Sequence, residues 1–246
     1  MRQRTDLPAR RVHGVRVTRV ENQLIASLPW RERARLLAAC KPVQLAFGAV
    51  LGVRGEPTRQ VYFPHDCFIS LVTAIDGEPG LEVGMVGSEG MLGAPLALGV
   101  TTALFDASVQ GAGAAWCLST AAFRRQLALG EALRQAVHRY VYVLMAQLAT
   151  SGACTRFHGV APRLARCLLM SQDRAHSDTF HLTHEFLACL LGVRRVGITR
   201  AAGDLQRGAL IRYHRGDITV LDRAGLERAA CGCYAADRRA YEQVLR

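Results

Sequence analysis

Residues 182–207 read LTHEFLACLLGVRRVGITRAAGDLQR, and this stretch predicts two short helices separated by a glycine turn. Thr183 starts the first helix as an N-cap, and Glu185 adds an acid in its first turn, where a negative charge is favourable. Gly192 ends that helix at a point where a tight turn needs a positive φ. A second helix then begins near Arg194.

The second helix has one apolar and one polar side, as helical periodicity requires of an amphipathic segment. Its predicted buried stripe consists of Ile198, Ala201, Ala202 and Leu205. A short helix, a glycine turn and a second helix with exposed arginines form the geometry that reads a DNA major groove. The guanidinium fork suits this role because it binds guanine O6 and N7 together, or a phosphate. The positions expected to face outward are Arg194, Arg195, Gly197, Thr199 and Arg200.

The next segment predicts a β-hairpin, here called the wing. Two short β-type runs, Arg212–His214 and Ile218–Leu221, flank the turn Arg215–Asp217. We expect His214 and Arg215 at the tip of the wing to contact phosphate. The alternative for either residue is a solvated surface charge.

Upstream of this module, the chain is helical in texture from Ser119 to about Ala153. Apolar residues repeat there at heptad-like spacing, which is typical of a helix that pairs with another helix. We expect a homodimer seam, because a long apolar helix after a closed barrel has little of its own barrel left to cover. The alternative is a helix packed on its own barrel. The predicted seam is Leu133, Val137, Tyr140, Leu144 and Leu148.

The segment from Phe47 to Gly113 holds 12 of the 23 glycines, which separate short apolar runs. This texture predicts an antiparallel β-barrel or jelly roll. The fold class is therefore α+β, with a barrel, a long helix and a winged helix-turn-helix. The predicted domains are a basic, disordered arm at 1–20, a sensor-like barrel at 21–120, the dimerisation helix at 121–160 and the DNA-binding domain at 161–246.

Charge is distributed unevenly along the chain, whose formal net charge is +11. Residues 61–120 contain no Lys or Arg and six acids, whereas residues 181–246 contain eleven basic and seven acidic residues. A basic terminal third favours a polyanionic partner. The sequence shows neither a signal peptide nor an apolar run of about 18–20 residues, so we expect a cytoplasmic protein without a membrane partner.

Eight cysteines are scattered without a CxxC pair, and we expect reduced, mostly buried thiols. Cys231 and Cys233 are the only close pair, a weak metal or redox signal that we interpret as ordinary packing. His181 and His184 have the spacing of one helical face and would form at most a weak metal site with Glu185. We therefore predict no metal and no cofactor.

The chain resembles the family of the cyclic-AMP receptor protein and the fumarate–nitrate regulator (CRP/FNR) over roughly residues 22–230. LAFGAVLGVRGEPTRQVYFP and GSEGMLGAP are similar to the family's barrel, and LSTAAFRRQL to the short helix that closes it. LTHEFLACLLGVRR followed by GALIRY is similar to its helix-turn-helix and wing, and is the most specific part.

The resemblance implies roles for particular positions of the helix-turn-helix. Arg195 and Arg200 correspond to the family's base- and phosphate-reading arginines, and Thr183 and His184 to the phosphate-contacting start of the first helix. Val196 stands where many members have a base-reading glutamate. This departure changes the expected target sequence but leaves DNA binding as the expected function.

The barrel departs from cyclic-nucleotide-binding members, which hold the cyclic phosphate with an Arg-Ser pair. Phe105 and Asp106 lie near those positions, and an unpaired phosphate beside an aspartate would be strongly unfavourable. We therefore predict that the barrel does not bind cyclic AMP or another cyclic nucleotide in the ordinary mode. Glu89 matches the family's ribose-binding glutamate loosely, and we interpret it as a solvated turn acid. The first cysteine is Cys40, so the N-terminal cluster of iron–sulfur members is missing. His65 and Cys67 remain candidates for a haem ligand, although packing is the simpler role.

These observations favour a homodimeric, sequence-specific transcription regulator that binds double-stranded DNA. Its barrel either senses an unidentified small-molecule effector or is structural, and RNA polymerase is a further candidate partner. A barrel enzyme of cupin type needs several histidines, and residues 47–118 contain only His65. The alternative is a barrel-based protein-interaction module without DNA binding.

Overall fold

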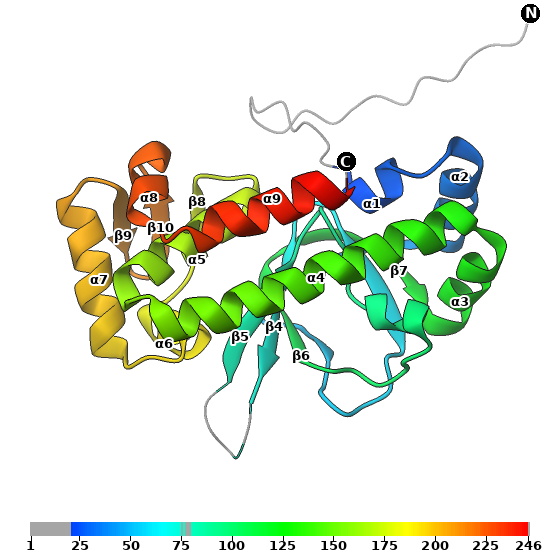
Figure 1. The fold of residues 1–246 in the computed structure, drawn as a ribbon, viewed down its shortest axis with the longest axis horizontal. Coiled ribbons are helices and arrows are strands. Elements are labelled where there is room, and N and C mark those ends of the chain that lie inside the picture. The colour runs from blue at the N-terminus through cyan, green and yellow to red at the C-terminus, as the bar shows by residue number, and fades with distance from the viewer. Residues whose placement is uncertain (1–20, 75, 77–79, 246) are drawn as a thin grey trace, which may run out of the picture.

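The computed structural model describes residues 21–74, 76 and 80–245, so the predicted basic arm at 1–20 lies outside the described part. The two short helices α1 (Gln23–Ala26) and α2 (Trp30–Ala39) precede a β-rich domain, a long helix and a C-terminal helical module (Figure 1). The predicted α+β fold class and the order of its parts are confirmed.

The β-rich domain consists of two antiparallel sheets rather than a closed barrel. One sheet has the order β1-β7-β3 and the other has the order β2-β6-β4-β5. Among the described residues, no strand of one sheet pairs with a strand of the other, so the domain is a jelly-roll-like sandwich. The strands are β1 (Lys41–Leu45), β2 (Val50–Gly52), β3 (Gln60–Pro64), β4 (Phe68–Thr73), β5 (Leu81–Val86), β6 (Asp106–Gly111) and β7 (Gly113–Ser119), with the 3₁₀ helix η1 (Ala94–Leu98) between β5 and β6.

The long helix α4 (Glu131–Phe157) follows α3 (Thr120–Leu129), which Ser119 caps, and it runs along the β-rich domain (Figure 1). Leu133, Val137 and Tyr140 are at most 2% exposed, because they pack in one core with residues of β3, η1 and α3. The structure corrects the predicted dimer seam at these three residues. They cover the open side of the chain's own sandwich, which a closed barrel would not have left available.

The C-terminal module begins with α5 (Val160–Ala175) and contains a small sheet of order β8-β10-β9. Its core is continuous with the sandwich, because Phe68 of β4 and Met85 of β5 belong to the same cluster as Leu164 and Leu168. The remaining elements are β8 (Thr179–His181), α6 (His184–Leu191), α7 (Arg195–Arg207), β9 (Ile211–His214), β10 (Asp217–Val220), α8 (Arg223–Ala229) and α9 (Cys233–Leu245).

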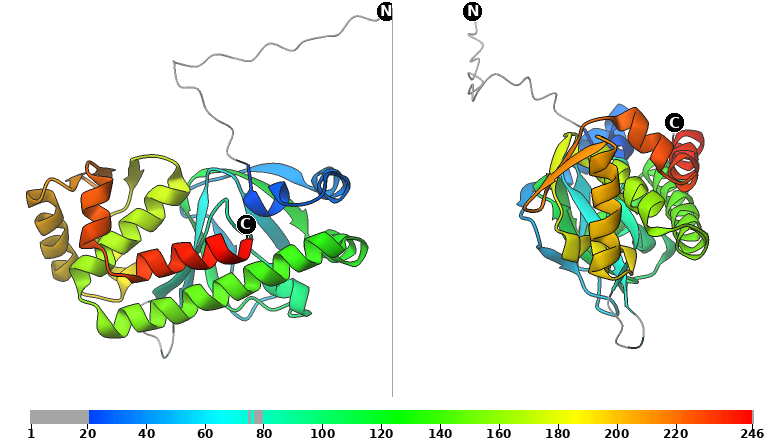
Figure 2. Two further views of the ribbon diagram at one scale, coloured as in Figure 1. Left: turned by 45° about the horizontal axis from the view of Figure 1, so that its top comes forward. Right: turned by 90° about the vertical axis from the view of Figure 1, so that its left-hand side faces the viewer.

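The last helix, α9, leaves this module and returns alongside α4 (Figures 1 and 2). Gln147 of α4 connects the two helices to the sandwich. Its amide nitrogen lies 3.4 Å from the Tyr241 hydroxyl, and its amide oxygen accepts from the Met85 amide at 3.2 Å. The C-terminal module is therefore attached to the sandwich through both of its ends.

A buried ion pair crosses the junction between the sandwich and α5. Arg174 contacts Glu89 at 2.7 Å, and their side chains are only 7% and 14% exposed. Glu89 is therefore an interdomain ion-pair partner, which corrects our interpretation of it as a solvated turn acid. Nearby, burial raises the pKa of Glu82 to about 7, although a hydrogen bond from Ser70 and the charges of Arg174 and Arg166 oppose the rise.

Within the described residues, no helix combines the length and apolar character that crossing a bilayer requires.

Candidate nucleic-acid interface

Helices α6 and α7 form the predicted helix-turn-helix, and the local signals act as expected. The Thr183 side chain accepts a hydrogen bond from the Phe186 amide and caps α6. Gly192 ends α6 with φ +60°, the left-handed conformation that glycine adopts without strain. Arg194 occupies the N-cap position of α7.

The two sides of α7 are separated as the sequence predicts. Ile198, Ala201, Ala202 and Leu205 are buried, whereas the side facing solvent begins with arginines. Helix α7 lies at one end of the molecule, where it faces the viewer in the right-hand view of Figure 2. No ion pair to an acid is present at these arginines within the described part of the chain. The exposed side chains here are Arg194, Arg195, Val196, Thr199 and Arg200.

The electrostatics of the α7 N-terminus are unfavourable in the free protein. The positive end of a helix dipole attracts negative charge, but the first turn of α7 holds no acid and begins with Arg194 and Arg195. Two cations beside unsatisfied backbone N–H groups create a surface that an anion would stabilise. The arrangement is therefore well suited to binding phosphate.

His184 connects the helix-turn-helix to the wing. Its ring stacks on Tyr213 with a centroid distance of 4.1 Å, and its Nδ1 lies 3.1 Å from the Thr199 hydroxyl, which donates to the Arg195 carbonyl. Its Nε2 is buried without a hydrogen-bond partner. Burial, followed by the nearby Arg195 charge, lowers the pKa of His184. The ring stacking and the Thr199 contact make His184 a positioning residue in the free protein. Its expected contact with phosphate stays a prediction.

The wing is formed by β9 and β10, and its predicted turn is confirmed at Arg215 (φ +50°) and Gly216 (φ +95°). His214 and Arg215 are exposed at its tip.

His181 lies in β8, where its Nδ1 is 2.8 Å from Asp217, and its ring leaves no room for a Cβ on Gly216. The predicted shared helical face of His181 and His184 is therefore wrong, since α6 begins only at His184.

The back of the helix-turn-helix rests on the β4–β5 hairpin, a contact that no sequence signal predicted. A Cβ on Gly192 would lie 3.0 Å from the Leu81 side chain. Cys189 of α6 donates from its thiol to the Gly80 carbonyl at 3.3 Å. This contact orients the module so that α7 faces away from the sandwich.

The sandwich contains a mainly apolar cavity of about 240 Å³, closed on one side by Leu144 of α4. Phe105 contributes to its wall, and Asp106 accepts a hydrogen bond from the Arg54 amide. Arg59 and Glu56 also line the cavity. A cation is thus present there, although the charge pattern of residues 61–120 led us to expect none. The prediction that cyclic nucleotides do not bind in the ordinary mode stays a prediction.

Comparisons with known proteins agree with this geometry. Residues 162–229 match the family model described as the Crp-like helix-turn-helix domain. No curated protein matches the chain. A CRP/FNR-family transcriptional regulator from Eubacterium rectale has a similar structure, with a TM-score of 0.64 and 16% identity over 85% of this chain and 99% of that one.

Two further solved structures have the same fold. A CRP-family transcriptional regulator from Thermus thermophilus has a TM-score of 0.63 and 20% identity over 76% of this chain and 96% of its own. The c-di-GMP-responsive global regulator CLP from Xanthomonas campestris has a TM-score of 0.62 and 16% identity over 78% of this chain and 99% of its own. At such identities these structures establish the fold of the chain and not its ligand.

Proposed function

We propose that this chain, a member of the CRP/FNR family of transcription regulators, is not an enzyme but binds specific DNA sites as a homodimer. The observation that carries the proposal is the exposed, unpaired group of arginines at the N-terminus of α7, beside the wing tip. Such a group favours a polyanion over a protein surface, which supports DNA binding over the protein-interaction alternative.

In this arrangement α7 lies in the major groove of the duplex. Arg195 and Arg200 contact base edges or phosphates, whereas Arg194 and the Thr183 end of α6 lie nearer to the backbone. Val196 is 75% exposed on the same side and offers an apolar contact to a thymine methyl group. Gly197 has no side chain and Thr199 has a short one, so the duplex can approach the helix closely between the arginines. Arg215 and His214 of the wing supply further phosphate contacts.

The proposed dimer uses the exposed side of α4 rather than its buried side. Tyr142 and Met145 are 61% and 62% exposed, an unusual state for large apolar side chains on a helix of this length. Exposed positions follow one another at spacings of three and four, which is the pattern of a helix pair. Leu144 and Leu148 of the predicted seam are half-buried and flank this surface. The revised seam is Tyr142, Met145, Ala149 and Gly152.

The effector proposal rests on the cavity in the sandwich. Its wall includes Leu144 of α4, so a molecule bound there would contact both the sandwich and the proposed dimerisation helix. The mainly apolar wall favours an uncharged, largely apolar small molecule. Its polar contacts would come from Glu56 and Arg59.

Selection of bound fragments from a random DNA pool tests the function directly. We expect a two-fold-symmetric site, with half-sites about one helical turn apart, as two α7 helices in one dimer would require. Affinity for that site should fall steeply as salt rises, because each phosphate contact releases counterions. Affinity that is independent of salt, or selection of no consensus with and without cell extract, would contradict the proposal.

A further inference from the structure

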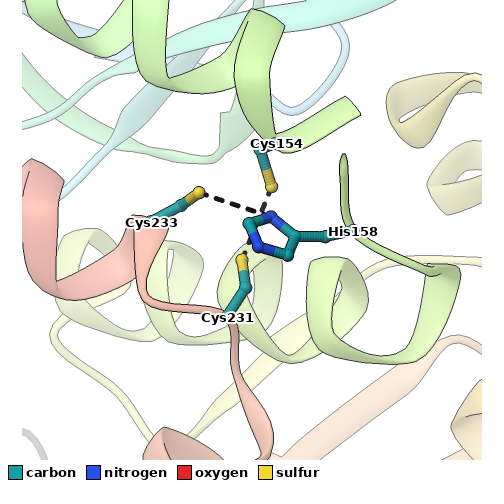
Figure 3. Close-up of side chains that lie close together, drawn as sticks. All are labelled: Cys154, His158, Cys231 and Cys233. Atoms are coloured by element: carbon teal, nitrogen blue, oxygen red, sulfur yellow. Dashed lines mark hydrogen bonds between the residues drawn. The ribbon is translucent and has the colours of Figure 1, made fainter. Parts of the chain in front are cut away.

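Four side chains with metal-binding atoms meet where α4, α5 and the loop before α9 adjoin (Figure 3). Cys154 and His158 come from the end of α4, and Cys231 and Cys233 come from the loop and the first residue of α9. Their ligand atoms all lie within 4.8 Å of one another, and no other such group occurs in residues 21–74, 76 and 80–245. We call these four residues the Cys₃His cluster.

The distances within the cluster fit a tetrahedral metal centre. The sulfurs of Cys154 and Cys231 are 3.5 Å apart, and the Cys233 sulfur is 3.6 Å from His158 Nδ1. Zinc bonds of about 2.3 Å to sulfur and about 2.0–2.1 Å to nitrogen give tetrahedral edges of about 3.8 Å and about 3.6 Å. A single ion at the centre would therefore reach all four atoms after small side-chain movements.

The backbone fixes the positions of the four residues. Cys154 and His158 are four residues apart on the last turn of α4, so they share a face, and the His158 amide donates to the Cys154 carbonyl at 3.1 Å. The Cys231 amide lies 3.4 Å from the Pro162 carbonyl at the start of α5. Cys154 and Cys231 are buried, whereas His158 and Cys233 are half-buried. The cluster is thus shielded but open to an ion from one side.

We propose that the Cys₃His cluster binds one Zn²⁺ ion through three thiolates and the His158 imidazole. Each thiol loses its proton on binding, so one Zn²⁺ displaces three protons and the site carries one net negative charge. The bound ion joins the end of α4 to the start of α9, and the Cys231–Pro162 backbone contact connects this centre to the start of α5. It therefore fixes the angle at which the helix-turn-helix leaves the long helix. This proposal is independent of DNA binding.

The surrounding charges complement such a site. The Arg166 guanidinium lies within electrostatic range of the Cys154 and Cys233 thiols. Arg166 is only 11% exposed and is held by Asp237 at 2.6 Å and by Ser151 at 3.3 Å. A fixed cation therefore lies close enough to stabilise a zinc–thiolate centre of net negative charge.

Titration of the reduced full-length protein with Co²⁺, followed by displacement with Zn²⁺, tests the proposal. We expect one equivalent of Co²⁺ to produce the strong visible band of a tetrahedral ion together with thiolate-to-cobalt charge transfer, and Zn²⁺ to remove both. The variants Cys154→Ser, Cys231→Ser, Cys233→Ser and His158→Ala should each weaken binding at least tenfold. Cys189→Ser is the matched control, because Cys189 lies in α6 outside the cluster, and it should bind like the parent.

Several results would overturn the zinc assignment. An octahedral Co²⁺ spectrum, or binding that none of the four variants weakens, would contradict it. So would a purified protein that carries iron and sulfide in the site. A Cys154–Cys231 disulfide that persists under reductant in place of metal would contradict it as well. If the buried variants do not fold, the half-buried pair Cys233→Ser and His158→Ala decides. A folded protein with unchanged Zn²⁺ affinity in both would also overturn it.

Discussion

The C-terminal module contains two groups of arginines with opposite surroundings. On α5, Arg166 and Arg174 are buried and contact Asp237 and Glu89 at 2.6 and 2.7 Å. On α7, Arg194, Arg195 and Arg200 are exposed, and none forms an ion pair within the described residues. The two helices pack against each other and carry the same residue type.

The difference follows from the cost of moving a charge out of water. A guanidinium is stable when buried only if acids and carbonyls replace its hydrating water. The α5 arginines are therefore paired with Asp237 of α9 and Glu89 of the sandwich and are not available to other partners. The α7 arginines keep their water and remain available to an external anion. Net charge alone therefore overstates the basic surface that is available to a polyanion, and the partners of each arginine decide its role.

Removal of a buried arginine should produce the largest effect on stability. Arg174→Ala leaves Glu89 as an uncompensated buried charge, and we expect a loss of about 3–5 kcal/mol in the free energy of unfolding. Chemical denaturation measures this loss. The exposed Arg207→Ala is the control, and its surface pair with Asp204 should contribute less than about 1 kcal/mol. Equal effects of the two substitutions would remove the distinction between the groups.

The exposed arginines of α7 should contribute to DNA affinity rather than to stability. Arg195→Ala combined with Arg200→Ala removes two of the proposed DNA contacts, and we expect a loss of about 2–4 kcal/mol in binding, roughly thirtyfold to a thousandfold. Fluorescence anisotropy on the selected site measures the affinity. The unfolding free energy should not fall, and the mass of the dimer should stay unchanged. Loss of the dimer with DNA affinity retained would instead support a protein-interaction role for α7.

Glu82, which lies near the buried arginines of α5, should make the free energy of unfolding depend on pH. The folded-state pKa of about 7 lies above the ordinary value, so the neutral carboxyl contributes stability that is present at low pH and lost as pH rises. Between about pH 5 and about pH 8, the parent should lose on the order of 1–3 kcal/mol relative to Glu82→Gln. Denaturation at both pH values measures this, with the exposed Glu56→Gln as control. Parallel pH profiles for parent and Glu82→Gln would show that the carboxyl is charged throughout.

The smallest expected effect tests how far the exposed arginines of α7 destabilise the free protein. Arg194→Glu replaces a cation with an acid at the positive end of α7, and we expect a gain of about 0.3–1 kcal/mol in unfolding free energy. The same substitution should weaken DNA binding. Thermal unfolding at low salt measures the gain, which should shrink as salt screens the charge. A loss of stability would mean that Arg194 has a structural partner.

The helix-turn-helix was predictable because its signals are local. Thr183 as a cap, Gly192 as a left-handed turn and the apolar stripe of α7 each act within a few residues, and all are confirmed. The wing turn at Arg215–Gly216 was predicted on the same basis. Sequence reasoning therefore located the elements of the candidate DNA-binding surface and most of its exposed residues.

Features that depend on distant partners were not predictable in this way. The buried side of α4 was assigned to a second protomer, since the sequence does not show that the sandwich is open and covered by Tyr140. Glu89 could not be matched with Arg174 across 85 positions. Cys154 and Cys231 are 77 positions apart, so the short CxC spacing revealed only half of the cluster.

The return of α9 along α4 has a mechanical consequence. A module joined to its neighbour by a single linker can swing freely, but one fastened at entry and exit can only rotate about the line that joins the two attachments. Movement of α7 away from the sandwich therefore requires release of the α9 contacts as well as the contacts of α5. A stop codon placed after Ala230 would remove α9, with Asp237 and Tyr241, and leave the module attached through α5 and its core contacts with β4 and β5.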